Sequence, residues 1–363
     1  MAYRFPSHSG FTLICILGNK MDLREGLGFA HSSIQEQQAY KLMLKAFSSM
    51  AVSINCSQLN RDVDLMKVLQ IVLGDNPSVI YFDKTKIQIE ESVLGKRILL
   101  TGVHSKPQAE KMNQTLDVTA NKIASLIKTK AASNDEYSLL ITLYEILQKN
   151  IRYDKDELQA NARGTSKNPA SHNAYGAIIN KLAVCDGFSS AFVLLAQKLG
   201  LKCMLVVGRS AYTSTLAEHA WNIVKVHDRY YHMDITWDAR KYQEFDEFSY
   251  VYFAVTDVEI AGDHSWNKSA TPICLYNDFS YYSKSGLYAN NTGQLNEIIK
   301  GIGGKNAGIF RAKLSPEIKL PDNAGDYLVQ MALNEAAKPG QRIQASYDWN
   351  ENTRCFFAKI IYP

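Results

Sequence analysis

Residues 171–208 read SHNAYGAIINKLAVCDGFSSAFVLLAQKLGLKCMLVVG, and residues 218–238 read EHAWNIVKVHDRYYHMDITWD. We interpret the first stretch as a helix that presents a thiol, followed by a strand. The second stretch is interpreted as a β-hairpin that presents a histidine and a carboxylate. A thiol, an imidazole and a carboxylate in one site are the groups that nucleophilic cysteine chemistry requires. The rest of the chain is therefore interpreted around these two stretches.

The predicted helix begins at Cys185. Apolar residues then recur at helical spacing, and Gly200 is placed to end the helix. A thiol in the first turn lies near unpaired backbone N–H groups and the positive end of the helix dipole, which stabilise a thiolate. The same N–H groups can bind the oxyanion of a tetrahedral intermediate. A lone cysteine is also commonly a small buried core residue, and this helix alone leaves both interpretations open.

The predicted hairpin consists of two alternating segments, 219–226 and 229–237, separated by two residues that predict a tight turn. In the register set by that turn, His219 and Asp234 share one face as diagonal neighbours, about 7–8 Å apart in the backbone. The carboxylate can then fix the imidazole tautomer and leave the other ring nitrogen for the thiol. A surface histidine and a solvated acid are the plainer interpretations of either residue taken alone.

His232 is the main rival for the role of base, because it lies on the same predicted face as Asp234. It is only two residues from the acid along its own strand, and would therefore adjoin the acid there. His219 instead reaches the acid across the hairpin, and is preferred for that reason.

The order Cys185, His219, Asp234 resembles that of the transglutaminase-like superfamily, within the papain-like cysteine enzymes. AYGAIINKLAVCDGFSSAFVLLAQKLGL is similar to that family's nucleophile helix, and HAWNIVKVHDRYYHMDITWD is similar to its His and Asp hairpin. Further along, YFAVTD and DHSWN resemble later landmarks. The resemblance covers about residues 134–282 and is closer to uncharacterised bacterial proteins with a transglutaminase core, related to the cytokinesis-protein-3 group.

This resemblance implies an α+β fold with a papain-like/transglutaminase-like core, in which the nucleophile starts a helix packed on an antiparallel sheet. It implies Cys185 as nucleophile, His219 as base and Asp234 as the residue that orients the base. A Tyr-Gly pair ten positions before the cysteine is typical of the family. Tyr175 could therefore line the groove and donate its hydroxyl towards the oxyanion, or simply pack on a turn. Trp221 is a second candidate for the groove or the oxyanion site.

Length, net charge and the spacing of the cysteines exclude several classes of protein. A length of 363 residues exceeds that of a usual single domain and predicts two or three modules. A net charge of +4 without a basic block argues against a nucleic-acid partner. The cysteines show no CxxC and no metal-ligand spacing, so neither zinc nor any other metal is expected. No clustered acidic loop predicts a calcium site, and no cofactor is expected. The six cysteines are Cys15, Cys56, Cys185, Cys203, Cys274 and Cys355.

The N-terminus has only a weak leader pattern. An apolar run at residues 11–17 follows a single Arg4, but polar residues interrupt it at 18–20 and no convincing small-residue cleavage site follows. No segment is expected to span a membrane. We therefore expect a cytoplasmic protein; the scattered cysteines are also compatible with disulfides in a secreted or envelope-associated one.

Four segments are predicted along the chain: a poorly ordered leader over 1–32, an accessory α+β module over 33–104, the catalytic core over 105–285, and a small C-terminal α+β module over 286–363. Helices are expected from Ser33 to Phe47 and over 63–72, 106–129, 136–149, 290–304 and 326–337. Strands are expected over 78–83, 86–92, 97–103, 250–255, 309–314, 341–347 and 353–361. Polar loops are expected over 155–173 and 239–247.

Two functions remain open at the level of the sequence. The first is cysteine-dependent acyl transfer on protein or peptide amides through a thioester, with water as acceptor in a peptidase or deamidase and an amine in a transglutaminase. The second is a catalytically silent binding or scaffold module, acting at the cell envelope or in cell division. The superfamily contains cross-linking enzymes, deamidases, peptidases, glycanases and inactive members, so the resemblance does not choose between them. A complete set of nucleophile, base and orienting acid favours the first.

Overall fold

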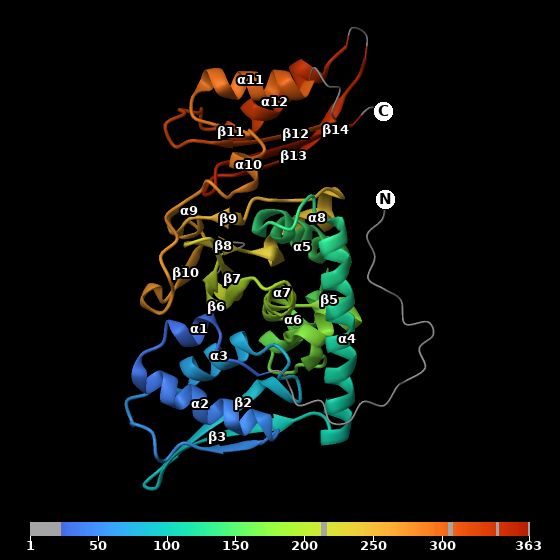
Figure 1. Cartoon of the computed structure of the whole chain (residues 1–363). Coiled ribbons are helices and arrows are strands. Elements are labelled where there is room, and N and C mark those ends of the chain that lie inside the picture. Colours follow the sequence, from blue (N-terminus) through green and yellow to red (C-terminus); the bar gives the residue numbers. More distant parts are fainter. Residues whose placement is uncertain (1–22, 212–215, 304–307, 339–340, 362–363) are drawn as a thin grey trace.

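The structure is a computed structural model, and it describes residues 23–211, 216–303, 308–338 and 341–361. Three tiers are stacked along the long axis of the molecule in the order of the sequence, with the first part of the chain at the bottom of Figure 1. Helix α4 (Lys106–Lys130) runs beside the lower and central tiers. The apolar run at 11–17 and most of the expected leader lie outside the described residues.

The lower tier is a three-stranded antiparallel sheet with helices packed on it (Figure 1). Helix α2 begins at a capping box, in which the Ser33 side chain accepts from the Glu36 N–H and the Glu36 carboxylate accepts from the Ser33 N–H. In sheet order the strands are β1 (Ser53–Asn55), β3 (Gly95–Gly102) and β2 (Phe82–Ser92), and the helices are α1 (Leu27–Ala30), α2 (Ile34–Ser48) and α3 (Leu65–Asp75).

Two details of this tier differ from the sequence prediction. Of the strand expected at 78–83 only residues 82–83 are extended, and they belong to the same strand as 86–92, because β2 pairs with β3 on both sides of an irregularity between Phe82 and Ile87. Part of the segment assigned to the leader also belongs to the fold, since the N–H groups of Gly28 and Phe29 donate to the buried Asp75 carboxylate at 3.1 and 2.9 Å.

The central tier is an antiparallel five-stranded sheet covered on one side by helices, with α7 against the sheet (Figure 1). Its strands, in sheet order, are β10 (His264–Trp266), β6 (Lys202–Ser210), β7 (Ala217–Val226), β8 (Arg229–Met233) and β9 (Phe253–Val255). A separate parallel pair joins β4 (Arg152–Tyr153) to β5 (Leu182–Ala183).

The helices of this tier supply most of the main core. Those predicted over 106–129 and 136–149 are confirmed as α4 and α5, and the predicted nucleophile helix is α7. The helical elements after α4 are α5 (Glu136–Asn150), α6 (Lys155–Ala162), η1 (Pro169–His172), η2 (Gly176–Asn180), α7 (Cys185–Lys198), α8 (Ile235–Phe245), α9 (Asp257–Ile260), η3 (Lys268–Ala270) and α10 (Tyr281–Lys284).

The β7–β8 hairpin has the predicted register. Val226 pairs with Arg229 and Asn222 with Met233, so the next residues, Trp221 and Asp234, face each other across the end of the ladder. The second strand is shorter than expected, because it ends at Met233 and the chain turns directly into α8.

Three further predictions in this tier are wrong. Residues 239–247 are mostly helical in α8 and not a loop, because the amphipathic 235–245 segment is capped at its start and packs against α5. Only 253–255 of the strand expected at 250–255 is extended. The polar stretch 155–173 contains α6 and η1. Buried polar contacts, described below, hold these two elements in place.

The upper tier is a four-stranded sheet with two helices on one face (Figure 1). The helices expected at 290–304 and 326–337 and the strands expected near 309–314, 341–347 and 353–361 are all present, with bounds shifted by a few residues. In chain order the elements are β11 (Tyr288–Ala289), α11 (Thr292–Gly303), β12 (Ile309–Leu314), α12 (Ala324–Ala336), β13 (Gln344–Asn350) and β14 (Cys355–Ile361).

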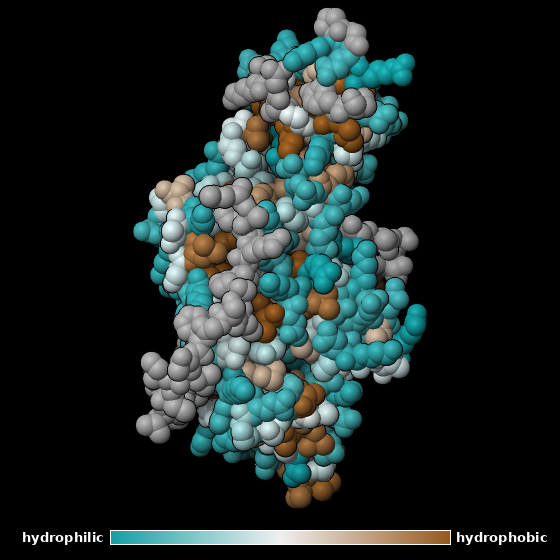
Figure 2. Space-filling model, turned by 90° about the vertical axis from the view of Figure 1, so that its right-hand side faces the viewer, coloured by the Kyte–Doolittle hydropathy of each residue, from teal (hydrophilic) through white to brown (hydrophobic). Residues whose placement is uncertain are grey.

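On the face shown in Figure 2, apolar side chains form separate patches among polar ones. The most exposed large apolar residues include Val93 and Leu94 at the β2–β3 turn, with 91% and 85% of their surface exposed. Among the described residues, none of the helices combines the length and the apolar character that crossing a bilayer demands.

Candidate active site

Cys185 is the first residue of α7. The residue before it, Val184, has an extended backbone and supplies no side-chain cap, so no N-cap side chain occupies the first N–H groups of this helix. Cys185 is half-buried, whereas Cys56, Cys203 and Cys274 are buried. Cys185 is therefore the least buried of the cysteines that the structure describes.

The start of α7 needs a glycine two residues after the nucleophile. A Cβ atom on Gly187 would lie 2.2 Å from the carbonyl oxygen of Ser171 and 2.9 Å from the Cβ of Ala183. The η1 backbone thus packs directly against the first turn of α7, and this contact fixes where Cys185 lies.

Two hydrogen bonds hold α7 on strand β7. The Ser189 hydroxyl donates to the carbonyl of Ala220 at 3.0 Å, and the Asn222 amide donates to the carbonyl of Ser189 at 3.2 Å. Ser189 lies about one helical turn after Cys185, so these bonds bring the start of the helix to the part of β7 that carries His219. The backbone N–H of Ala220, the residue after His219, hydrogen-bonds to the Cys185 thiol.

His219 and Asp234 are joined across the hairpin. The Nε2 atom of His219 lies 2.8 Å from Oδ2 of Asp234, and both side chains are buried. Because an ionised carboxylate only accepts hydrogen bonds, Nε2 carries a proton and Nδ1 is left for another partner. This is the tautomer that a base acting on a neighbouring thiol requires.

Asp234 also caps the next helix. Its Oδ1 atom accepts from the N–H groups of Thr236 and Trp237 at 2.9 and 3.2 Å, which makes it the N-cap of α8. Burial alone would raise the pKa of Asp234, but His219 and His264 outweigh it and hold that pKa well below its usual range. The carboxylate is therefore charged and its two oxygens have separate tasks.

Sequence reasoning assigned no role to His264 and missed its contact with the acid. Its Nε2 atom lies 3.2 Å from Oδ2 of Asp234, the oxygen that also binds His219. The adjacent pair Asp263-His264 was visible in the DHSWN motif, but only the pairing of β10 with β6 brings it to the hairpin.

The rival base His232 is committed elsewhere. Its side chain is fully buried, its Nδ1 accepts the indole N–H of Trp221 at 3.0 Å, and its Nε2 contacts Oδ1 of Asp257 at 2.8 Å. Burial lowers the pKa of His232 despite the nearby carboxylate. With both ring nitrogens occupied, His232 cannot accept a proton from Cys185.

The two groove candidates lie in different surroundings from those expected. Trp221 is fully buried and its N–H is used by His232, so it cannot donate to an oxyanion; its ring stacks on His219 with 6.0 Å between ring centres. Tyr175 is half-buried and packs against the main core, which is the plainer of the two interpretations made for it from sequence.

Tyr153 is a site residue that sequence reasoning did not assign. Its ring stacks on Phe188 of α7, and the guanidinium of Arg240 lies over the same ring. Burial raises the pKa of its hydroxyl, and the next largest contribution comes from Cys185. The signal in the sequence was the IRYD segment, in which β4 pairs with β5 just before the nucleophile.

The resting thiol is neutral, which differs from the expectation of a helix-stabilised thiolate. Burial raises the pKa of Cys185 to about 12, and the carboxylates of Asp186 and Asp234 act in the same direction. The N–H groups of Ala220 and Asp186 oppose this shift only in part. Chemistry at this sulfur therefore needs a base that removes the proton.

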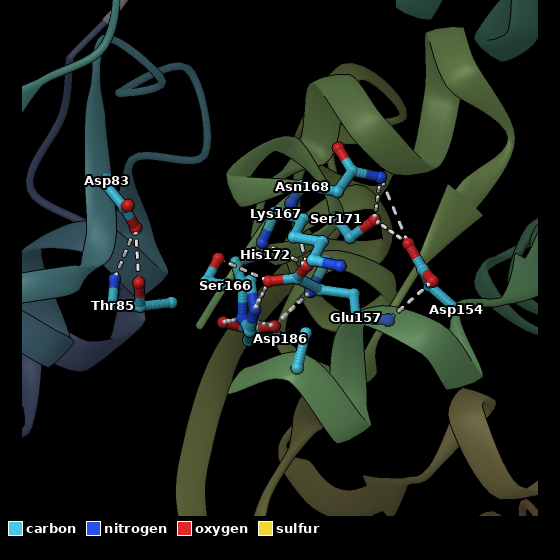
Figure 3. Close-up of polar contacts among 12 residues, drawn as sticks. Asp83, Thr85, Asp154, Glu157, Ser166, Lys167, Asn168, Ser171, His172 and Asp186 are labelled. Atoms are coloured by element: carbon cyan, nitrogen blue, oxygen red, sulfur yellow. Dashed lines mark hydrogen bonds and ion pairs between the residues drawn. The ribbon is translucent and has the colours of Figure 1, made fainter. Parts of the chain in front are cut away.

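A buried polar cluster borders the nucleophile (Figure 3). His172 lies between two carboxylates, with Nδ1 at 3.0 Å from Asp186 and Nε2 at 3.3 Å from Glu157. Glu157 also accepts the hydroxyl of Ser166 and the N–H groups of Lys167 and Asn168. These contacts tie the chain before η1 to α6 and to the first turn of α7.

The charge state of this cluster follows from its contacts. Both ring nitrogens of His172 face carboxylates, so both donate and the ring is an imidazolium. Burial opposes that charge, but Asp186 and Glu157 outweigh it and raise the pKa of His172. The positive ring lies next to Asp186, and so balances the negative charge adjoining Cys185.

Among the described residues, two groups of side chains bring potential ligand atoms within 4.8 Å of one another: His219, Asp234 and His264, which are all buried, and His232, Asp257 and Cys274, of which Asp257 is half-buried. The group that contains His232 does not fit a metal. Nδ1 of His232 accepts the N–H of Trp221, so the ring proton of His232 is on Nε2. A histidine that binds a metal normally donates its other ring N–H outward, and the indole prevents that. The group that contains His264 does not fit a metal either, because the Nε2 atoms of His219 and His264 both donate to Oδ2 of Asp234 and so present no lone pair to an ion there.

Comparison with known proteins finds a family match for the central part of the chain. Residues 124–235 match the core-domain model of the transglutaminase-like superfamily. The match contains Cys185, His219 and Asp234, begins earlier than the resemblance seen in the sequence, and stops before its expected end. No curated protein matches the chain.

Three solved structures are similar to parts of this chain at low identity. A structure described as a TGase has 13% identity and a TM-score of 0.29, over 42% of this chain and 44% of the other. A protein provisionally described as a cysteine protease from Cytophaga hutchinsonii has 13% identity and a TM-score of 0.27, over 42% and 61%. One provisionally described as a protease from Parabacteroides distasonis has 8% identity and a TM-score of 0.28, over 76% and 61%. The chain thus spans 44% to 61% of the length of these structures.

Proposed function

We propose that the protein catalyses cysteine-dependent acyl transfer on protein or peptide amides, because residues 124–235 match the core-domain model of the transglutaminase-like superfamily. Cys185 is the nucleophile, His219 the base, and Asp234 the residue that orients the base. The observation that supports this most directly is the 2.8 Å contact between His219 and Asp234, at the place where α7 is hydrogen-bonded to β7.

In the proposed reaction, Nδ1 of His219 takes the thiol proton while the sulfur attacks the carbonyl carbon of the amide. The oxyanion that forms is held by backbone N–H groups at the start of α7. His219 then gives its proton to the leaving nitrogen, the C–N bond breaks and a thioester remains on Cys185. Water or an amine attacks the thioester, and the sulfur leaves and recovers its proton through His219.

The neutral resting thiol gives His219 a defined role. A thiol whose pKa is about 12 is almost wholly protonated at pH 7, so the rate depends on proton removal during the attack. A positioned general base contributes about 10²- to 10⁴-fold to such a step. Cys185 and His219 therefore act as one unit whose members cannot be removed independently.

The same raised pKa supports a second candidate, a catalytically silent module that keeps the fold and binds a protein partner. In that case the buried His219–Asp234 pair is a structural element, and Cys185 reacts as an isolated buried thiol. The two candidates differ in one measurable property, which is whether His219 accelerates reactions at Cys185.

The test is alkylation of the native protein with iodoacetamide at pH 7, with the labelled sites identified by mass spectrometry. We expect Cys185 to be labelled first, with buried Cys203 and Cys274 as internal controls. His219→Ala should slow labelling of Cys185 by about 10²-fold, the lower end of general-base effects. His227→Ala, on the exposed turn of the same hairpin, is the matched control. A folded His219→Ala variant that alkylates at the wild-type rate would rule out the enzyme and leave the silent module.

The acyl acceptor is decided by a second experiment. Peptide mixtures are incubated with the wild-type protein and with Cys185→Ala, and the products are compared by mass spectrometry. New termini indicate a peptidase, conversion of glutamine to glutamate a deamidase, and isopeptide bonds a transglutaminase. Only products that Cys185→Ala does not form count as products of this site.

A further inference from the structure

A second imidazole lies on the carboxylate that orients His219. Oδ2 of Asp234 is 2.8 Å from Nε2 of His219 and 3.2 Å from Nε2 of His264. The rings of the two histidines lie 5.3 Å apart, and His264 is buried. The triad as proposed above has no use for this third ring.

His264 is bound by carboxylates on both sides. Its Nδ1 atom lies 2.5 Å from Oδ1 of Asp263, and its Nε2 atom contacts Asp234. An ionised carboxylate can only accept, so each ring nitrogen must donate and the ring carries a positive charge. Burial acts against that charge, but the hydrogen bonds that the ring donates to Asp234 and Asp263 outweigh it and raise the pKa of His264 to about 8.

The environment of His264 contains few other charged groups. Besides the two carboxylates, the ring is surrounded by the indoles of Trp221 and Trp237, with 4.9 and 4.6 Å between ring centres. A charge buried among indole rings needs compensating partners, and the two carboxylates supply them. The titratable groups that face His264 are Asp234, Asp263, His219, the buried and uncharged His232, and the Tyr252 hydroxyl.

We propose that His264 is a positioning residue of the acyl-transfer site, a buried imidazolium that fixes Asp234 and opposes a second positive charge on His219. The inference rests on the proposed function, since it assigns His219 the role of base. A cation on the shared oxygen neutralises part of the carboxylate's charge, so Asp234 can orient His219 while presenting less negative charge to it. His219 then stays available to take the proton of a neutral thiol.

This arrangement gives the upper tier a part in the site. The free oxygen of Asp263, Oδ2, accepts the Tyr252 hydroxyl at 2.6 Å and the Asn352 side-chain amide at 2.9 Å. Asn352 lies in the turn between β13 and β14, and its neighbour Asn350 donates to the Tyr252 hydroxyl at 2.9 Å. The Asp263 carboxylate stabilises the positive charge on His264. A residue of the C-terminal module, Asn352, therefore helps to hold that carboxylate in place.

The first experiment observes the charge directly and needs no activity. Ring ¹⁵N spectra of the histidines are recorded against pH in Cys185→Ala, and the eight signals are assigned by single His→Gln changes. We expect both nitrogens of His264 to be protonated at pH 6.5, with titration near pH 8. Asp263→Asn should move that titration to lower pH. One unprotonated His264 nitrogen at pH 6.5 would overturn the inference, whether or not the protein is an enzyme.

The second experiment measures what the charge does. The rate of Cys185 alkylation is followed from pH 5 to 10 in wild type, His264→Gln and the control His227→Gln. Glutamine keeps an N–H donor for Asp234 but carries no charge, so the acid-side midpoint of the rate should rise by about one pH unit. His227→Gln should leave the midpoint unchanged.

The experiments distinguish a failure of the inference about His264 from a failure of the proposed function. If His264→Gln folds and keeps the wild-type midpoint, the ring acts only as a hydrogen-bond donor and the charge claim is wrong. If the wild-type profile is instead that of an isolated thiol and does not respond to His219→Ala, the proposed enzyme is wrong, while the ¹⁵N titration still decides the state of His264.

Discussion

Trp221 donates its indole N–H to Nδ1 of His232 at 3.0 Å, and this bond removes His232 from the candidates for the base. We predict that His232→Ala leaves Cys185 alkylation per folded molecule within about twofold of wild type. It should lower stability by several kcal/mol, because it opens a cavity, leaves the indole N–H without a partner at about 1–3 kcal/mol, and removes one of the partners of the Asp257 carboxylate. Urea unfolding and the alkylation rate, measured on the same preparation, check both statements. A large loss of reactivity with unchanged stability would contradict them.

Asp234 is predicted to tolerate neither asparagine nor alanine, for different reasons. Asp234→Asn keeps an oxygen for the N–H groups at the start of α8, but its amide N–H₂ would face Nε2 of His219. The ring proton would then move to Nδ1, and turnover should fall on the order of 10⁴-fold, as in other triads whose acid is amidated. Asp234→Ala loses the helix cap as well, so it should be less stable than Asp234→Asn by about 1 kcal/mol. Equal melting temperatures of the two variants would show that the cap contributes nothing.

Gly187→Ala is expected to damage the site through the backbone. A methyl group there would meet the Ser171 carbonyl at 2.2 Å, so η1 or the first turn of α7 must move and carry Cys185 with it. We expect a stability loss of at least about 1–3 kcal/mol, as for other overpacked sites, together with slower alkylation. The matched control is Gly301→Ala in α11, where no atom lies within 4 Å of the added methyl. That change should be neutral or stabilising by about 0.5–1 kcal/mol.

The charge on His172 predicts how stability depends on pH. The folded-state pKa is raised above the unfolded value of about 6.5. Its contribution is therefore fully present below about pH 6.5 and is lost as pH rises through the folded-state pKa. The gap in melting temperature between wild type and His172→Gln should be largest near pH 6 and smaller at pH 9. A gap that stays constant or widens at high pH would mean that His172 is neutral in the fold.

The upper tier is joined to the central one by a buried ion pair, in which Lys313 Nζ lies 2.5 Å from Oε1 of Glu259. Lys313 has 2% of its side chain exposed and Glu259 has 18%. Glu259→Gln leaves a buried ammonium and should cost about 3–5 kcal/mol. Lys313→Met leaves a carboxylate that water can reach, so it should cost less. Urea unfolding of both variants tests the order, and a larger loss for Lys313→Met would reverse the interpretation.

Local patterns in the sequence were sufficient for much of the fold. The two residues between the alternating segments set the hairpin register, because a tight turn fixes which residues pair, and Val226 does pair with Arg229. Apolar residues at helical spacing located α4, α5 and α7, because a helix repeats every 3.6 residues. The position of Cys185 in the first turn of α7 follows from that spacing.

Other features depended on which segments meet in space. Residues 235–245 read as the end of a strand and a loop, but they form α8 because the buried Asp234 caps them and α5 covers them. His264 reaches Asp234 only because β10 pairs with β6, thirty residues along the chain from the acid. The contact between His264 and Asp234 leaves no local pattern in the sequence.

The charge states of the site show most clearly what the sequence determined and what the tertiary structure determined. By itself the sequence determined which groups are present and in what order: Cys185 at a helix start, then His219 and Asp234 across a hairpin. Only the tertiary structure decided that the thiol is neutral, that His232 is occupied and that a third histidine shares the acid. The physical reason is that a pKa is set by burial and by charges a few ångströms away, and those neighbours come from distant parts of the chain.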